Sequence, residues 1–416
     1  MIKLFFLLVL ASGMLVAQTP NATNTQTIGK FLKLSKVPSG LETDNVLVRG
    51  TDGIVKFVPR SSIGGGSQVN ADWLATSGVA MILNKPTIVG EDISGANYII
   101  VKGKGTPSEN GLEFSSKYIL AKNMSPNGSV KSANNRVKII VFPGEYSFSG
   151  DIEFDTEFVD IISITNNADI IIKSTGNCIV SANDVYIKGI NTLTKALYTI
   201  NSTNSLLKLE NCEGGDGSFG NGSGTYTNCI GGIGSFAGNG GIASGTFINC
   251  IAKAYSFGGN TGSGNGTASG KFINCESKGD FSFGKRTVSG TFINCKSGSY
   301  SFGQSGGTPN GETVSGTFTN CTAGGFSFGG NGNCTASGVF TNCTAGDYSF
   351  GGYNGIASGT FIECVGGLQS FAGESSGVLS GRLIRCSLTS GTFRTVSAQG
   401  KTRFCLNADF SINTQN

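Results

Sequence analysis

The sequence predicts an all-β protein, a right-handed parallel β-helix (a solenoid) that follows a small N-terminal stem. Three observations in the second half of the chain lead to this prediction. A four-residue element, F-I/T-N-C with looser copies, recurs nine times at a mean spacing of about 22 residues. A Phe follows the Cys of each copy after seven residues, or after eight in one copy. The length variation falls in one connecting loop per repeat, as expected where an insertion must leave a stack of turns.

The first 17 residues have the features of an export signal. Lys3 precedes an apolar run that begins at Leu4 and reaches Ala17. This run is shorter than the roughly 20 apolar residues that a membrane span needs, and the small residues near its end suit cleavage before Gln18. We therefore expect residues 1–17 to be a signal peptide and the mature chain, with no membrane span, to be secreted or displayed at the cell surface. A retained N-terminal anchor is the alternative.

Residues 18–97 are expected to form a stem and linker. Asp44–Ile63 has the pattern of a strand, an Asp-Gly turn and a second strand, and a later string runs from Trp73 to Pro86. Both passages resemble segments that recur in bacteriophage tail-fibre and tail-spike proteins. The resemblance implies a receptor-binding protein, placed in a virion tail if the gene is phage-encoded. The export signal departs from that family and favours a surface or secreted relative.

Residues 98–210 are predicted to be the entry turns of the β-helix and its cap. Val137–Phe148 contains a buried strand, a Pro-Gly turn and an alternating strand, and its I-x-x-P-G-x-Y arrangement resembles the first turn of pectin-lyase-like β-helix proteins. An open first turn exposes unpaired N–H and C=O groups, so we expect a short helix at Tyr118–Met124 to cap it. Further irregular turns are expected at Ile161–Ile164, Ile170–Ile172 and Val185–Ile190.

Residues 211–416 are predicted to be the repetitive turns and the C-terminal end. Alternation along the recurring element places Phe247 inside and Thr246 and Ile248 outside. Asn249 then occupies a bend that tolerates left-handed geometry, and Cys250 turns inward again. The repeated turns therefore predict stacked columns of Phe, Asn and Cys along the solenoid.

The Cys column has two interpretations. In-register turns bring Cα atoms about 4.8 Å apart, within the range that a disulfide spans, and exported chains often use disulfides. Parallel side chains instead point their sulfurs along the stack, which predicts a buried column of free thiols. The column is expected to hold the Cys residues at 212, 229, 250, 275, 295, 321, 343, 364 and 386, with Cys178, Cys334 and Cys405 outside it.

Composition excludes several classes of function. The chain of 416 residues has no His, so Ser-His-Asp, Cys-His and His-ligated zinc chemistry are ruled out. Charged residues make up 13% with a net charge of +4, which gives no sign of nucleic-acid binding. No C-x-x-C spacing points to a metal, and we expect no cofactor. The densest acids are expected on a solvated outer face, with a cation or sugar site as the alternative: Glu145, Asp151, Glu153, Asp155, Glu157 and Asp160.

These observations favour a non-catalytic function. We expect an exported adhesin or tail-fibre-like receptor-binding protein that recognises surface glycans. The alternative, which the pectin-lyase-like resemblance implies, is a polysaccharide depolymerase, either a lyase or a glycoside hydrolase. The acids of the repeats occupy different columns, whereas glycoside hydrolysis needs a pair of carboxylates roughly 5–9 Å apart. We therefore assign no catalytic residue.

Two candidate surfaces follow from the stacking of the repeats. In-register turns bring the variable loops to one edge, where a glycan would meet planar amides and an aromatic side chain: Asn260, Asn265, Gln304, Asn310, Asn331, Tyr353 and Asn354. The outward positions of the recurring strand are mostly β-branched and predict an apolar stripe that a homotrimer would bury: Thr246, Ile248, Ile273, Thr291, Ile293, Val339, Thr341 and Ile362. The tail-fibre resemblance implies the three-fold symmetry. Alternatively, these residues only satisfy strand propensity on a wet face.

Overall fold

A computed structural model of the chain describes two units, Met1–Lys85 and Pro86–Asn416. The described residues are 45–49, 51, 55–59, 97–193, 195–199, 206–220, 222–238, 240–259, 266–303, 312–330, 332–352, 354–373, 376–393, 401–409 and 411–413. In the first unit, β1 (Asn45–Arg49) pairs antiparallel with β2 (Val55–Pro59). This pairing confirms the two strands predicted within Asp44–Ile63. The Trp73–Pro86 string lies outside the described residues.

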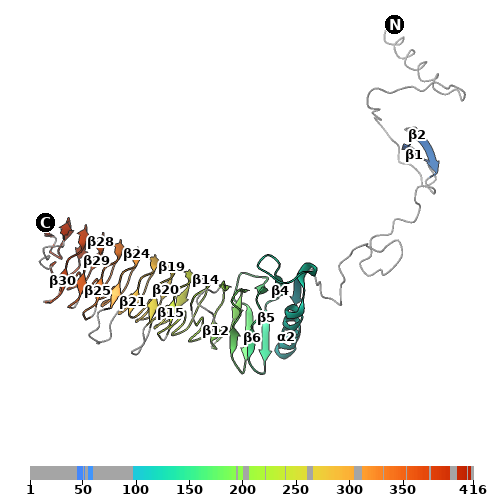
Figure 1. Cartoon of the computed structure of the whole chain (residues 1–416), viewed down its shortest axis with the longest axis horizontal. Helices are drawn as coiled ribbons and strands as arrows, with labels where there is room; N and C mark the ends of the chain where they lie inside the picture. Colours follow the sequence, from blue (N-terminus) through green and yellow to red (C-terminus); the bar gives the residue numbers. More distant parts are fainter. Residues whose placement is uncertain are drawn as a thin grey trace, which may run out of the picture. The chain divides into compact units, whose positions relative to one another are not determined.

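The second unit is a parallel β-solenoid of about 11 turns, which confirms the predicted fold class. Figure 1 shows the turns stacked from α2 at one end to the C-terminal strands at the other. The largest sheet has 14 parallel strands, about one from each turn. In spatial order they are β3 (Tyr98–Val101), β4 (Val137–Val141), β7 (Val159–Ser163), β10 (Tyr186–Lys188), β13 (Lys208–Glu210), β14 (Thr225–Thr227), β16 (Thr246–Ile248), β19 (Lys271–Ile273), β22 (Thr291–Ile293), β24 (Thr317–Thr319), β26 (Val339–Thr341), β28 (Thr360–Ile362), β31 (Arg382–Ile384) and β33 (Lys401–Arg403).

Shorter strands build the other faces. A seven-stranded sheet contains β15 (Ile242–Ala243), β18 (Thr267–Ala268), β21 (Thr287–Val288), β23 (Thr313–Val314), β25 (Thr335–Ala336), β27 (Ile356–Ala357) and β30 (Val378–Leu379). The entry turns have two three-stranded sheets, made of β5 (Gly144–Phe148), β8 (Ile170–Ser174) and β11 (Ile190–Asn191), and of β6 (Ile152–Phe154), β9 (Cys178–Val180) and β12 (Leu197–Thr199). Isolated bridges continue the first of these through β17 (Ile251–Ala252) and β20 (Glu276–Ser277) to β29 (Val365–Gly366), β32 (Ser387–Leu388), β34 (Cys405–Leu406) and the antiparallel β35 (Ile412–Asn413).

A helix covers the first turn, and it is longer than predicted. It is α2 (Pro107–Asn123), not the seven residues from Tyr118 to Met124, and a 3-10 turn, η3 (Pro126–Gly128), follows it. The helix begins at a capping box, in which Thr106 and Glu109 bond each other's backbone N–H groups. Phe114 packs edge-on against three aromatic rings of the first turns: Tyr146, Phe148 and Phe154. This packing sets α2 against the edge strand β5.

Two columns of aromatic rings fill the interior of the repetitive turns. In the column that contains Phe247, neighbouring rings stack with centroids 4.7–5.1 Å apart. The second column contains Phe257, and its rings stack at similar spacings. Rings of one column meet rings of the other edge-on, for example Phe292 and Phe302 at 5.4 Å and 89°. Stacked and edge-to-face contacts are both favoured aromatic geometries, so the predicted Phe ladder is in fact a double ladder.

The thiol column is buried and contains no disulfide, as the second interpretation predicted. All twelve cysteines of the chain are free and buried. Column thiols contact backbone carbonyl oxygens, as Cys250 does with Ile248 O of its own turn at 3.5 Å and Tyr226 O of the preceding turn at 3.3 Å. The exclusion of Cys405 was wrong, because Leu406 N donates to Cys386 O and continues the column. The spacing of 19 residues from Cys386 fits the repeat, but Thr402 stands where the recurring element has its inward Phe or Leu, so the element is not recognisable there.

Two further columns hold the corners of each turn. Asn249 adopts the predicted left-handed conformation with φ of 53°, and its Nδ2 donates to Asn228 Oδ1 at 3.0 Å. At the Ser-Gly step, a Cβ on Gly316 would lie 2.4 Å from Gly290 O, and Gly245, Gly270, Gly290, Gly338, Gly359 and Gly381 have equivalent contacts. The close approach of neighbouring turns therefore requires glycine at this column.

Candidate ligand-binding surface

The predicted glycan-binding loops fall largely outside the described residues. Asn260, Asn265, Gln304, Asn310, Asn331 and Tyr353 lie there. Asn354 is described: it is half-buried in a left-handed conformation with φ of 59°, and its side-chain oxygen accepts a hydrogen bond from Ser376. The prediction for these residues therefore stays a prediction.

The ends of the loops are described, and they lie in rows. At the start of the loops, Gly258 N donates to Phe236 O and Gly284 N donates to Phe257 O, one turn below in each case. At the end, Thr267 N donates to Gly241 O and Thr335 N to Glu312 O. Because both ends of each loop are held in register, the loops leave and re-enter the solenoid along one edge.

The outward stripe is narrower than predicted. Strand register places two outward columns on the 14-stranded sheet. The first, which contains Thr246, Thr291 and Val339, is interrupted by the exposed Lys271 and Arg382. The second is uncharged over eight turns and consists of half-buried side chains: Thr227, Ile248, Ile273, Ile293, Thr319, Thr341, Ile362 and Ile384. Only the second column therefore forms a continuous stripe. Alternation along a strand shows which residues face outward, but it does not show which of them share a column.

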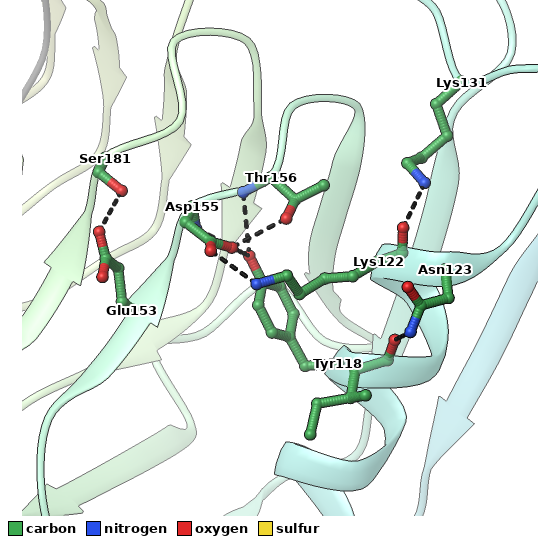
Figure 2. Close-up of polar contacts among 9 residues, drawn as sticks. Tyr118, Lys122, Asn123, Lys131, Glu153, Asp155, Thr156 and Ser181 are labelled. Atoms are coloured by element: carbon green, nitrogen blue, oxygen red, sulfur yellow. Dashed lines mark hydrogen bonds and ion pairs between the residues drawn. The ribbon is translucent and has the colours of Figure 1, made fainter.

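Among the acids of the entry turns, Asp155 holds α2 against the solenoid. Figure 2 shows Tyr118, Lys122 and Thr156 gathered around its carboxylate. Lys122 Nζ lies 2.6 Å from Asp155 Oδ2, and Thr156 Oγ1 and Tyr118 Oη donate to Oδ1 at 2.8 and 3.1 Å. Burial acts to raise the pKa of Asp155, but these donors outweigh burial and hold it below its ordinary value. A carboxylate with three internal donors is suited to anchoring the cap.

Neighbouring acids also have internal partners. Glu153 accepts from Ser181 Oγ at 2.5 Å, as Figure 2 shows, and Glu145 pairs with Lys173 Nζ at 2.7 Å. Asp151 accepts from the backbone N–H of Asn177 at 2.6 Å. These acids are exposed or half-buried, in keeping with the predicted outer face.

Asp160 departs from that prediction, because it is buried in an ion triad. Arg136 binds both of its carboxylate oxygens at 2.6 and 2.8 Å, and binds Asp184 Oδ1 at 2.7 Å. Hydrogen bonds to Asp160, opposed by burial, raise the pKa of Arg136 above its ordinary value. The triad lines a hollow of about 530 Å³ together with Tyr186 and Lys208. Alternation along one strand does not reveal the triad, because Asp160 and Asp184 lie 24 and 48 residues after Arg136 in the sequence.

Another buried acid lies in the repetitive turns. Glu312 is only 5% exposed, and Arg286 Nε and Cys334 Sγ of the adjacent turns each lie 3.9 Å from one of its carboxylate oxygens. Burial, partly offset by the charges of Arg286 and Lys285, raises the pKa of Glu312 to about 7. This group therefore titrates near neutral pH.

An aromatic column on the outside of the solenoid was missed by the sequence analysis. Tyr255, Phe281, Tyr300, Phe326 and Tyr348 occupy equivalent positions in five consecutive turns, and we call them the outer aromatic ladder. Their rings are half-buried and stacked, with centroids 4.9–5.5 Å apart and interplanar angles of 6–21°. The signal in the sequence is the recurring tripeptide Y/F-S-F, whose first residue is the ladder position and whose last is the buried Phe.

The described residues show neither a membrane-spanning helix nor a group that could hold a metal. Among them, no helix is both long and apolar enough to cross a bilayer. The same residues contain no cluster of three or more potential metal-ligating Cys, Asp or Glu side chains. Comparison of the chain with protein-family models, with curated proteins and with solved structures gives no match.

Proposed function

We propose that this protein is an exported, non-catalytic adhesin or tail-fibre-like receptor-binding protein that recognises surface glycans. The observation that carries the proposal is the row of loop ends along one edge of a rigid parallel solenoid. Loops rich in Gly, Asn and Gln, displayed in a row, offer many planar amides to one extended ligand. Multiple weak contacts along such a row add up to useful affinity for a repetitive polymer.

Three acids of the entry turns support the non-catalytic form of the proposal. General acid catalysis needs a carboxyl group that can hold a proton and reach the substrate. Asp155, Asp160 and Asp184 instead each accept hydrogen bonds from cationic side chains of the same chain. These contacts occupy the carboxylate oxygens and favour structural roles for the three carboxylates.

A glycan microarray probed with the purified mature chain tests this function. We expect binding to a subset of glycans, with no release of reducing ends or unsaturated products from the bound polysaccharides. Shortening the loops at 259–266 and 303–312 to the length of the shortest repeat, with the thermal midpoint retained, should abolish binding. Binding that survives in a folded, loop-shortened variant would contradict a role for the loops.

We also propose that the chain acts as a homotrimer in which the uncharged outer column of the 14-stranded sheet is buried. Support comes from the eight half-buried Thr and Ile residues of that column and from the resemblance to tail fibres. Light scattering at micromolar concentration should give a trimer mass for the wild type and a lower mass for Ile248→Lys with Ile293→Lys. A monomeric wild type, or a trimer that the two lysines leave intact, would refute this interface.

A polysaccharide depolymerase is the second candidate, and one observation favours it. The hollow of about 530 Å³ beside Arg136 has a size typical of small-ligand sites and brings Asp184, Tyr186 and Lys208 to its wall. Burial, followed by the hydrogen bond to Glu210, raises the pKa of Tyr186 above its ordinary value. If capsule or pectin-type glycans are cleaved, and Asp184→Asn abolishes cleavage without unfolding the chain, the depolymerase replaces the adhesin. Loss of cleavage on changing Glu153 or Asp155 would likewise overturn the non-catalytic proposal.

A further inference from the structure

A groove crosses the entry turns beside the cap. It consists of two hollows, of about 640 and 330 Å³, whose walls share Ser147, Phe148 and Thr175. The larger hollow is lined by α2 and by the corner that follows β5, and the smaller one by the corners that follow β8 and β11. Every residue of these walls is described, and none belongs to the variable loops. Hollows of this size are typical of small-ligand sites.

The fold holds the walls of the groove in place. A Cβ on Gly111 would lie 2.0 Å from Ser147 O, so α2 lies directly against β5. Thr175 N donates to Phe148 O at 3.2 Å and joins the corners of two successive turns. A ligand therefore meets preformed walls that it does not have to order, which lowers the entropic cost of binding.

Hydroxyl groups line the groove, and most of them have no internal partner. One wall hydroxyl, that of Ser115, donates to Gly111 O at 2.9 Å. Four others make no side-chain hydrogen bond within the described part of the chain: Ser108, Ser147, Ser149 and Thr175. A hydroxyl group both donates and accepts hydrogen bonds. The hydroxyl groups of a sugar do the same, so the walls of the groove match a glycan.

Phe148 supplies an aromatic surface between the two hollows. The side chain is half-buried and lines both of them. Among the described rings only Phe114 contacts it, with centroids 6.0 Å apart and an interplanar angle of 90°. A perpendicular contact of this kind covers at most one face of a ring, so aromatic surface remains open to the groove. The apolar C–H face of a sugar ring can pack there.

Two residues of the larger hollow favour a sugar that carries an acetamido group. Leu112 is 72% exposed, although it is a large apolar side chain. Asp151 is exposed as well, and one of its carboxylate oxygens accepts from Asn177 N at 2.6 Å, which leaves the second oxygen for a ligand. An acetamido group offers a methyl group to the leucine and an N–H donor to the carboxylate. An unsubstituted hexose offers no methyl group.

The charges and strands of the groove disfavour two other ligands. Lys173 is paired with Glu145 at 2.7 Å, so Asp151 and Lys195 remain as one negative and one positive charge, with no net attraction for a polyanion. β8 lies between β5 and β11 in its sheet, and α2 lies against β5, so the groove has no open strand edge for an extended peptide. We therefore propose that the groove binds a short segment of a neutral, N-acetylated glycan.

The choice of ligand class rests on the proposed glycan-binding function, to which the groove adds a second site and a kind of sugar. A single small site binds more weakly than a row of loops that contact one polymer together. The affinity of the groove is therefore measured by titration at millimolar ligand rather than on an array.

Titration of the mature chain with chitotriose tests the site. Cellotriose has the same β-1,4-linked backbone without acetamido groups and is the matched control ligand. We expect measurable affinity for chitotriose and at least about fivefold weaker binding of cellotriose. Trigalacturonate, an anionic trisaccharide, should not bind. A trimer of N-acetyllactosamine units, used beside chitotriose, distinguishes a cell-surface glycan from a chitin-like chain as the source. Binding of either supports the proposal, and the tighter ligand indicates the source.

Two variants place the binding in the groove. Thr175→Trp fills the groove at an exposed residue that both hollows share, and it should weaken chitotriose binding at least about tenfold. Thr322→Trp, the same change at an exposed threonine of the repetitive turns, is the control and should bind as the wild type does. If Thr175→Trp does not fold, Leu112→Ser keeps the proposal falsifiable. This exposed change should weaken chitotriose binding about threefold and leave cellotriose binding unchanged, a difference that partial unfolding does not produce.

The outcomes separate this inference from the proposed function. The loop-shortened variant should lose binding on the microarray and keep its affinity for chitotriose. If the wild type binds glycans on the array but neither N-acetylated trimer in titration, the groove is not a site, and the adhesin proposal stands. If it binds chitotriose but nothing on the array, the groove stands and the role of the loops fails. Equal affinities for chitotriose and cellotriose, or chitotriose binding that a folded Thr175→Trp variant retains in full, would overturn the inference.

Discussion

Replacing Phe292 by Ala tests whether the double aromatic ladder holds the turns together. The Phe292 ring has no solvent exposure and stacks on Phe272 and Phe318 at 4.7 and 4.8 Å. It also meets Phe283 and Phe302 edge-on at 6.0 and 5.4 Å. The truncation therefore removes four ring contacts at once and leaves a cavity in the middle of a continuous stack.

The magnitude follows from these contacts. Truncating a buried Phe to Ala costs about 3–5 kcal/mol, with the larger values where the surroundings do not collapse. The neighbouring rings are held in register by backbone hydrogen bonds between turns, such as Asn294 N to Thr319 O at 2.9 Å, which limits collapse. We expect a loss of about 4 kcal/mol. Phe292→Asp should cost more, because it also buries an unpaired charge.

Denaturant unfolding and hydrogen exchange measure the effect. The matched control is Thr317→Ala, an exposed change on the next turn, which should stay within about 0.5 kcal/mol of the wild type. Because each turn of a solenoid contacts only its neighbours, amide protection should fall most between residues 272 and 318. If Phe292→Ala shifts the midpoint no more than Thr317→Ala does, the inward ladder does not hold the turns together as argued.

Three further predictions concern backbone packing, the thiol column and pH. Gly316→Ala should destabilise the fold by about 3 kcal/mol, because its Cβ would lie 2.4 Å from Gly290 O, whereas Gly150→Ala, with open space around it, should be near neutral in the same denaturant titration. The twelve thiols should resist alkylation in the native state and should all react in guanidinium, because they are buried in the folded chain. Burial also raises the pKa of column members such as Cys212 and Cys229, which lowers their reactivity. Prompt labelling of the native protein would contradict the buried column. The raised pKa of Glu312 means that the folded state holds its proton more tightly than the unfolded state, so the stability due to this group is present below pH 4.5 and is lost as pH rises to about 7. Thermal midpoints between pH 4.5 and 8 should decline less in Glu312→Gln; equal slopes in both proteins would refute this.

The repetitive turns were predictable from the sequence because the positions of the recurring element keep the same residue types from turn to turn. Phe247, Asn249 and Cys250 lie where alternation placed them, since the strand has a period of two and the bend selects Asn. The entry turns were less predictable. The pairing of Arg136 with Asp160 and Asp184 joins residues on different turns, and only the strand register, which depends on the whole stack, shows that they meet.

The candidate surfaces depended on register in the same way. Lys271 and Val339 belong to the same outward column as Thr246, a fact that spacing within one repeat does not reveal. The outer aromatic ladder was missed for a different reason. Its position is occupied by Gly in some turns and by Tyr or Phe in others, so it does not stand out as a fixed element of the repeat.

The single irregular repeat shows how the fold keeps that register. Between Cys275 and Phe283 the chain has eight steps instead of seven, yet Phe257 and Phe283 stack at 4.6 Å and 3° in the interior. On the outside, Phe281 and Tyr255 are 5.5 Å apart and tilted by 21°, against 5.0 Å and 6° for the next pair. The extra residue is therefore absorbed before Phe281, and the surface bears the small distortion that the close-packed interior does not accept.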